Sequence, residues 1–137
     1  MKKSDNNVVS LFEQTNKGVQ KAVLTDSMKM KRGGSLSNPI VAYETWGKLS
    51  KQKDNVVVIL TGLSASSHVA SHSNNSKPGW WEGIVGPDNA IDTNRFYVIC
   101  INSLGSCFGS TGPASINQIT GEPFRLTFPE LTIDDMA

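Results

Sequence analysis

A short segment rich in Gly, Ser and His, residues 61–68 (TGLSASSH), directly follows the most apolar run of the chain, residues 56–60 (VVVIL). In an open parallel sheet, ligands bind at the carboxyl ends of the strands, so a loop there is well placed for a site. Small residues also let backbone N–H groups approach a substrate oxygen. The alternative is a polar loop that binds nothing, and these residues alone favour that alternative.

His68 and His72 are the two histidines of the chain, and their spacing would place them on one face of a helix. On such a face they could act as a general base or as metal ligands. The neighbouring Ser and Asn residues disfavour a helix, and no carboxylate follows at a ligand spacing. The sequence therefore predicts that both histidines pack within a loop and that no metal is bound.

Cys107 lies within residues 105–109 (GSCFG), a match to the nucleophile-elbow pattern with cysteine in place of serine. An elbow turns directly into a helix, whose N-terminus helps to ionise the thiol. The next residues, 110–113 (STGP), cannot begin that helix. We therefore predict that Cys107 is not a nucleophile. Cys100 and Cys107 form no CxxC pair, and we expect both thiols to be free.

Two runs of β-branched and aromatic residues, 56–60 and 96–101, predict parallel strands buried on both faces beneath helices. The connection between them has room for one short helical turn, at residues 80–85. Upstream, residues 19–43 alternate in polarity around Gly33-Gly34, which predicts an antiparallel hairpin. Residues 102–115 are too rich in Gly, Ser and Pro for a helix or a strand, and loops of that length are usually functional.

The two ends of the chain differ in character. Residues 1–17 are polar and lack periodicity, which predicts a disordered segment. Thr132 fits the N-cap of a helix, with Asp134 and Asp135 in its first turn, yet the sequence ends at residue 137. Because a newly begun helix needs further turns to be stable, we expect residues 18–137 to be the N-terminal part of a longer domain.

Composition excludes several classes of protein. The chain has 137 residues, 38% of them hydrophobic and 18% charged, as in ordinary soluble domains. Its longest apolar run is far too short to cross a bilayer, and no apolar stretch follows the basic N-terminus, so we expect a cytoplasmic protein. Ten of the 13 Lys and Arg residues lie before position 54, but they are scattered among apolar residues, which argues against nucleic-acid binding.

Short motifs occur in a characteristic order between residues 33 and 137. They are VAYETWG at 41–47, PGWW at 78–81, VGP at 85–87, IDT at 91–93, NSLGSC at 102–107, GSTGPASIN at 109–117, TG at 120–121 and FP at 128–129. Together they resemble the homoserine O-acetyltransferase family. The resemblance implies an α/β-hydrolase fold, here its N-terminal portion, in which an antiparallel hairpin leads into a parallel sheet that is truncated before the nucleophile elbow.

The resemblance also implies a mechanism. In the family, a Ser-His-Asp triad takes an acyl group from acyl-CoA and passes it to the hydroxyl of an amino acid. The triad would lie beyond this chain, which alone is expected to be inactive. The backbone N–H of Leu63 matches the family's oxyanion-hole donor, and Leu63, Ser64, Ala65 and Ser66 are the expected substrate-specificity loop. Acyl-CoA would be a co-substrate, with no cofactor, and the full-length protein would be a homodimer.

The leading interpretation is a homoserine O-acetyltransferase of methionine biosynthesis. Two segments depart from the sequences of many such enzymes: residues 61–65 read TGLSA rather than HALTG, and residues 109–115 read GSTGPAS rather than GTTGPSS. These departures look more like the serine O-succinyltransferase branch. The alternatives are therefore a serine O-succinyltransferase or serine O-acetyltransferase of cysteine biosynthesis, and an inactive truncated fragment.

Overall fold

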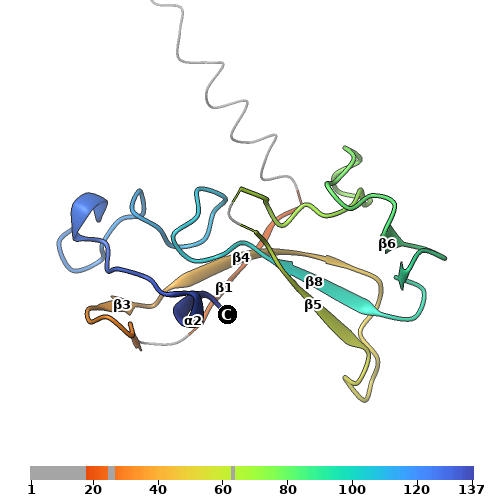
Figure 1. Cartoon of the computed structure of the whole chain (residues 1–137), viewed down its shortest axis with the longest axis horizontal. Helices are drawn as coiled ribbons and strands as arrows, with labels where there is room; N and C mark the ends of the chain where they lie inside the picture. The colour runs from red at the N-terminus through yellow and green to blue at the C-terminus, as the bar shows by residue number, and fades with distance from the viewer. Residues whose placement is uncertain (1–17, 25–26, 63) are drawn as a thin grey trace, which may run out of the picture.

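The computed structural model describes residues 18–24, 27–62 and 64–137. Its centre is a four-stranded sheet in the order β1-β4-β8-β5 (Figure 1). These strands are β1 (Gln20–Val23), β4 (Ile40–Trp46), β8 (Tyr97–Ile101) and β5 (Val56–Leu60). The two strands predicted from their apolar runs are thus present within one residue of the expected bounds. The disorder predicted for residues 1–17 lies outside the described residues.

The sheet is mixed in direction. β4 pairs antiparallel with β1 and β8, whereas β8 pairs parallel with β5. Parallel strands need a long crossover, and the connection between β5 and β8 supplies one. Since β5 and β8 run the same way, Leu60 lies opposite Ile101 at their carboxyl ends. The segments that follow both strands therefore begin at the same edge of the sheet.

The predicted hairpin is confirmed, in two parts. β1 pairs with β4, and between them β2 (Ser27–Lys29) pairs with β3 (Ser35–Ser37). The turn between β2 and β3 contains Gly33 and Gly34, both with positive φ, near 96° and 81°. Backbone bonds between Met30 and both glycines close it. Glycine adopts this left-handed conformation without steric cost, so the Gly-Gly pair determines where the chain reverses.

The prediction that the strand at residues 56–60 is buried on both faces is wrong for this chain. Ile59 on β5 is buried, but Val56, Val58 and Leu60 are 40%, 53% and 53% exposed. β5 is an edge strand, and no helix among the described residues covers its outer face. An aliphatic strand is suited to burial on both faces, but each face is buried only where another element packs against it.

The crossover between β5 and β8 contains little regular structure. Its only paired strands among the described residues are the two-residue β6 (Val85–Gly86) and β7 (Ile91–Asp92). Trp81 accepts bonds from Ile84 and Val85 in a single turn, as expected for this stretch. The connection packs its apolar residues against one face of the sheet. That core consists of Trp46, Ile59, Val69, Ala70, Val85, Val98 and Cys100.

The chain after β8 runs without helix or strand through residues 102–115, as predicted. It then forms the 3-10 turn η1 (Arg125–Thr127) and the short helix α2 (Ile133–Met136). Thr132 is the N-cap of α2, and its backbone N–H donates to Asp135 Oδ2 at 2.7 Å, which confirms the predicted helix start. Asp135 Oδ1 also accepts the backbone N–H of Lys31, so α2 is attached beside the β2–β3 hairpin. None of the helices described here is long and apolar enough to span a membrane.

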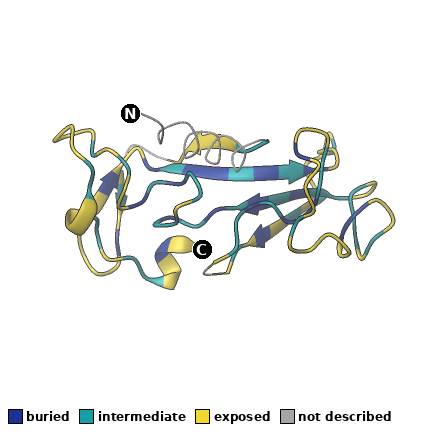
Figure 2. Cartoon of the chain, turned by 90° about the horizontal axis from the view of Figure 1, so that it is seen from above, coloured by how far each residue is buried: buried dark blue, intermediate teal, exposed yellow. Residues whose placement is uncertain are grey.

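Burial along the central strands follows the two-residue period of a pleated sheet. Ala42, Glu44 and Trp46 of β4 are buried, while Tyr43 and Thr45 between them are partly exposed. Figure 2 shows this pattern along β4, in contrast to the more exposed hairpin and C-terminal segments. Glu44 thus lies in the register that faces the core, a position where an ionised carboxylate needs partners.

Candidate functional site

The Gly, Ser and His-rich segment begins at the carboxyl end of β5, beside the carboxyl end of β8. Its first residue, Thr61, is bonded through Oγ1 to the carbonyl of Ile101 at 3.2 Å, and the Ser103 hydroxyl lies 3.3 Å away. Gly62 and Ser64 are exposed, and Ala65 and Ser66 are partly exposed. The structure therefore places this loop at the carboxyl end of the parallel strands, where the sequence predicted it.

The far end of the loop is bonded to the same edge. The backbone N–H of Ser67 donates to Asn102 Oδ1 at 2.6 Å, and Asn102 Nδ2 lies 3.1 Å from Ser67 Oγ. Both residues are buried, with exposed fractions of 0% and 1%. Asn102 is the first residue after β8. The loop after β5 is thus bonded to residues 101–103 through Thr61 at one end and Ser67 at the other.

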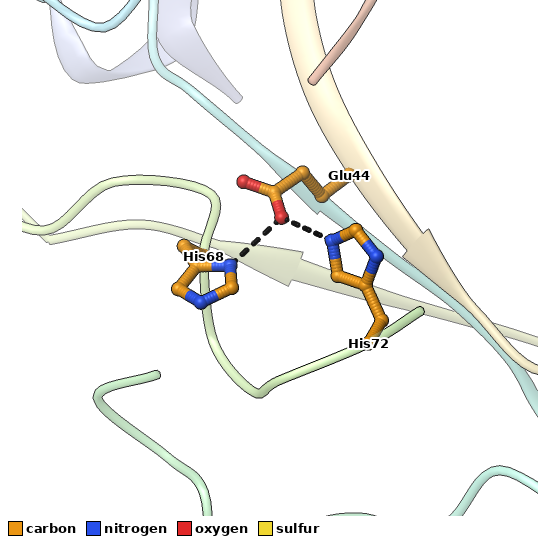
Figure 3. Close-up of side chains that lie close together, drawn as sticks. All are labelled: Glu44, His68 and His72. Carbon is orange, nitrogen blue, oxygen red and sulfur yellow. Dashed lines mark hydrogen bonds and ion pairs between the residues drawn. The ribbon is translucent and has the colours of Figure 1, made fainter. Parts of the chain in front are cut away.

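Glu44 on β4 is bonded to the far end of this loop and to both histidines. Its Oε1 accepts the Ser67 hydroxyl at 3.1 Å, and its Oε2 lies 2.9 Å from His68 Nδ1 and 2.8 Å from His72 Nε2. Figure 3 shows the two imidazole rings on either side of the carboxylate. The Glu44 side chain is 1% exposed, and the two histidine side chains are 14% and 13% exposed.

The other ring nitrogens indicate where the hydrogens lie. His68 Nε2 is 2.8 Å from the carbonyl oxygen of Lys77, which can only accept a hydrogen bond. Both ring nitrogens of His68 therefore face oxygen acceptors, Glu44 Oε2 and the Lys77 carbonyl. His72 Nδ1 accepts the backbone N–H of Asn74 at 3.3 Å, so its hydrogen is on Nε2, facing Glu44. The buried carboxylate thus lies within hydrogen-bond distance of three polar side chains, those of Ser67, His68 and His72.

This arrangement corrects the sequence-based view of the histidines. They do pack within a loop, as predicted, but a carboxylate faces both of them from 24 and 28 residues upstream. The sequence-based prediction considered only carboxylates that follow the two histidines in the chain. The available signal was a lone acidic residue at a core-facing position of a strand. The ligand atoms of Glu44, His68 and His72 lie within 4.8 Å of one another, an arrangement that could also hold a metal ion.

The two cysteines are free thiols in different environments, as expected. Cys100 is buried within β8, where desolvation raises the pKa of its thiol to about 12, and the negative charge of Glu44 adds to the effect. Cys107 is exposed, and the residues after it form bends rather than a helix. The helix that a nucleophile elbow requires is therefore absent at residues 108–113.

An apolar cavity of about 670 Å³ opens beside the loop. Leu60, Thr61, Gly62 and Ala65 line one side, and residues 103–106 lie next to them. The remaining wall comes from Pro113 and from residues within 128–137, including Phe128, Leu131 and Ile133. Ile133 itself is 78% exposed, so much of this wall faces open space. The loop thus borders a concave, mainly apolar region at the carboxyl ends of two parallel strands, the usual place for a ligand in α/β proteins.

Several known proteins are similar to this chain in sequence and fold. Two serine O-succinyltransferases, from Xanthomonas campestris pv. campestris (strain B100) and Frateuria aurantia, are 55% identical over 120 residues and 60% identical over 115 residues, which is 88% and 83% of this chain. A homoserine O-acetyltransferase structure from Bacillus anthracis matches 85% of this chain at 34% identity with a TM-score of 0.74. The chain belongs to the homoserine O-acetyltransferase family.

The fold class follows from the same comparisons. The crystal structure of esterase E22 matches 86% of this chain and 34% of its own, at 39% identity with a TM-score of 0.73. The mixed sheet is therefore part of an α/β-hydrolase fold, as the resemblance implied. No family model matches the chain. The chain spans about a third of the length of the relatives it matches: 32% and 31% of the two succinyltransferases and 33% of the acetyltransferase.

Family membership alone does not identify the site residues of this chain, so their positions are taken from the structure. Leu63, the predicted oxyanion donor, lies outside the described residues. Ser64, Ala65 and Ser66 lie between the two bonded ends of the loop and border the apolar cavity through Ala65. Sequence reasoning did not single out Glu44 or Asn102. Asn102 had no local signal, because its partners are Ser67 and Phe108 rather than residues of its own turn.

Proposed function

We propose that the complete protein to which this sequence belongs is a serine O-succinyltransferase, which transfers a succinyl group from succinyl-CoA to the serine hydroxyl. The observation that carries the proposal is the loop at residues 61–67, bonded at both ends to the carboxyl end of β8 and bordering the apolar cavity. The acceptor and donor are chosen from the names of relatives that are 55–60% identical.

In the proposed reaction, a serine nucleophile outside this chain takes the acyl group from acyl-CoA, and the acylated enzyme then passes it to the amino acid. Both steps develop negative charge on the acyl carbonyl oxygen. A backbone N–H that points at this oxygen stabilises it, and removal of such a donor typically slows catalysis by about 100- to 1,000-fold. We assign that role to the N–H of Leu63, with Ser64, Ala65 and Ser66 beside the incoming acceptor. Acyl-CoA is the co-substrate, no cofactor takes part, and we expect a cytoplasmic homodimer.

A homoserine O-acetyltransferase is the second candidate. It was the leading interpretation of the sequence, and it is supported by the likeness to the Bacillus anthracis acetyltransferase structure. That likeness is 34% identical, against 55% and 60% for the two serine O-succinyltransferases, which therefore favour the serine alternative. The two acceptors differ by one methylene, which a binding pocket distinguishes by about 1–3 kcal/mol.

The test is a matrix of two donors and two acceptors. The complete protein is incubated with succinyl-CoA or acetyl-CoA and with serine or homoserine, and the ester is identified by mass. We expect the highest kcat/KM for succinyl-CoA with serine. A preference for acetyl-CoA with homoserine would establish the second candidate instead. The 137-residue chain alone serves as the control and should form no ester.

A further inference from the structure

Asn102 is buried and makes five hydrogen bonds to three segments of the chain. Its side-chain Oδ1 accepts the N–H of Ser67 at 2.6 Å, and its Nδ2 donates to Ser67 Oγ at 3.1 Å and to the Phe108 carbonyl at 2.9 Å. Its backbone N–H donates to the carbonyl of Ala42 at 2.8 Å, and its carbonyl accepts the Ser110 hydroxyl at 2.6 Å. One residue thus connects β4, the loop after β5 and the loop after β8.

The orientation of the Asn102 amide follows from its neighbours. Ser67 has one hydroxyl hydrogen, which goes to Glu44 Oε1, so Ser67 Oγ must accept from Asn102. The Phe108 carbonyl also requires a donor. Both amide hydrogens and the amide oxygen are therefore used. Aspartate at this position would lack the donors, and it would add a second negative charge close to Glu44.

The loop that Asn102 holds has few other attachments. Between Thr61 and Ser67, the described hydrogen bonds are those of Ser66, whose carbonyl accepts Trp80 Nε1 at 2.8 Å and whose hydroxyl accepts the His68 N–H at 3.3 Å. Gly62 and Ser64 are exposed. A short exposed segment with so few internal contacts takes its position from its ends. The Thr61 and Ser67 attachments therefore determine where the described part of the loop, Gly62 and residues 64–66, lies.

We propose that Asn102 is a positioning residue for catalysis: through its paired hydrogen bonds to Ser67, it holds the loop at residues 62–66 where a backbone N–H meets the acyl oxygen. Glu44 supports the same bond from the other side, because it accepts the Ser67 hydroxyl. This inference rests on the proposed acyltransferase function. Asn102 does not touch the substrate in this scheme. Its effect is on the geometry of both half-reactions, because the acyl oxygen is stabilised in each.

The test uses the complete protein with Asn102→Ala and, as a matched control, Asn94→Ala, whose exposed amide donates to Asp88 Oδ1 at 3.3 Å. CoA release without acceptor is followed by stopped flow, and hydrogen exchange is measured on peptides that cover residues 61–68. We expect Asn102→Ala to slow the CoA burst by about 10- to 100-fold, with KM for acyl-CoA changed less than about twofold. Exchange should accelerate at residues 62–67 and stay unchanged in β4 and β8. Asn94→Ala should behave like the wild type.

A milder variant covers the case in which Asn102→Ala does not fold. Ser67→Ala removes the hydroxyl but keeps the N–H to Asn102 Oδ1, so its burst rate should fall between those of the wild type and Asn102→Ala. An unchanged burst rate in either folded variant, or faster exchange across the whole sheet, would overturn the proposal. If the wild type releases no CoA from succinyl-CoA or acetyl-CoA, the proposed function fails. The exchange at residues 62–67 still decides whether Asn102 holds the loop.

Discussion

Glu44 Oε2 lies 2.9 Å from His68 Nδ1, although 24 residues separate the two in the sequence. The carboxylate is buried, and His68 uses its second nitrogen to donate to the Lys77 carbonyl. A buried, hydrogen-bonded pair of polar side chains is costly to disrupt, because removal of one partner leaves the other buried without compensation.

Replacement of Glu44 by Gln should lower the free energy of unfolding by about 3 kcal/mol at neutral pH, as expected when one partner of a buried pair is removed. The measurement is urea unfolding of the protein. The matched control is Glu130→Gln, whose carboxylate pairs with Arg32 in an exposed ion pair. That change should cost less than about 1 kcal/mol. Equal losses of unfolding free energy for the two variants would show that the buried Glu44 carboxylate contributes no more stability than the exposed one of Glu130.

Asp135 should show a pH-dependent attachment of α2. The hydrogen bond from the Thr132 N–H, followed by that from the Thr132 hydroxyl, lowers the pKa of Asp135 below its ordinary value. A lowered carboxyl pKa contributes stability above the ordinary value, near 3.9, and this stability is lost as the pH falls through the lower folded value. The amide signals of Lys31 and Thr132 should therefore titrate together below about pH 3.9. In Asp135→Asn neither signal should titrate in this range, and a transition that persists would assign it to another group.

The two thiols should react at very different rates. Cys107 is exposed, whereas Cys100 is fully buried with a thiol pKa of about 12. The thiolate is the reactive form, so a disulfide reagent at pH 8 should modify Cys107 in the native protein and Cys100 only after unfolding. Cys107→Ser should abolish the native reaction. Rapid modification that survives in this variant would mean that the core around Cys100 opens readily.

The outer face of β5 should make the isolated 137-residue chain self-associate. Val58 is 53% exposed on an edge strand, and an apolar edge of this kind is a template for pairing with another chain. Val58→Lys should raise the fraction of monomer in sedimentation experiments. The control is Ile119→Lys, which replaces an 82% exposed side chain in the loop before η1 and should change association less. If the wild-type chain is already monomeric and unfolds cooperatively, this edge is not an association site.

Substitution of Ser64, Ala65 and Ser66 in the complete protein should alter the preference between serine and homoserine as acceptor. These side chains would border the acceptor, which enters only in the second half-reaction, so the ratio of kcat/KM for serine and homoserine should change by up to about 200-fold. CoA release without acceptor should change little, in contrast to the effect expected for Asn102→Ala. A strong effect on CoA release with an unchanged ratio would place acceptor choice outside this loop.

Local sequence patterns determined the elements of this protein. The aliphatic run of β5, the apolar run of β8, the Gly33-Gly34 turn and the Thr132 cap all appear at or within one residue of their predicted places. Each depends on the conformational preferences of neighbouring residues, which a sequence states directly. The order of motifs was sufficient to identify the family.

The tertiary structure decided how the site is held together. Glu44 meets His68 because β4 and β8 pair in one particular register, and Ser67 meets Asn102 because β5 and β8 end at the same edge. It also decided that the outer face of β5 is exposed, since the aliphatic run specifies only what can be buried. Hydrogen bonds between residues 24 or 35 positions apart exist only after the sheet has formed. No local preference encodes them, because neither partner affects the backbone of the other until the sheet brings them together.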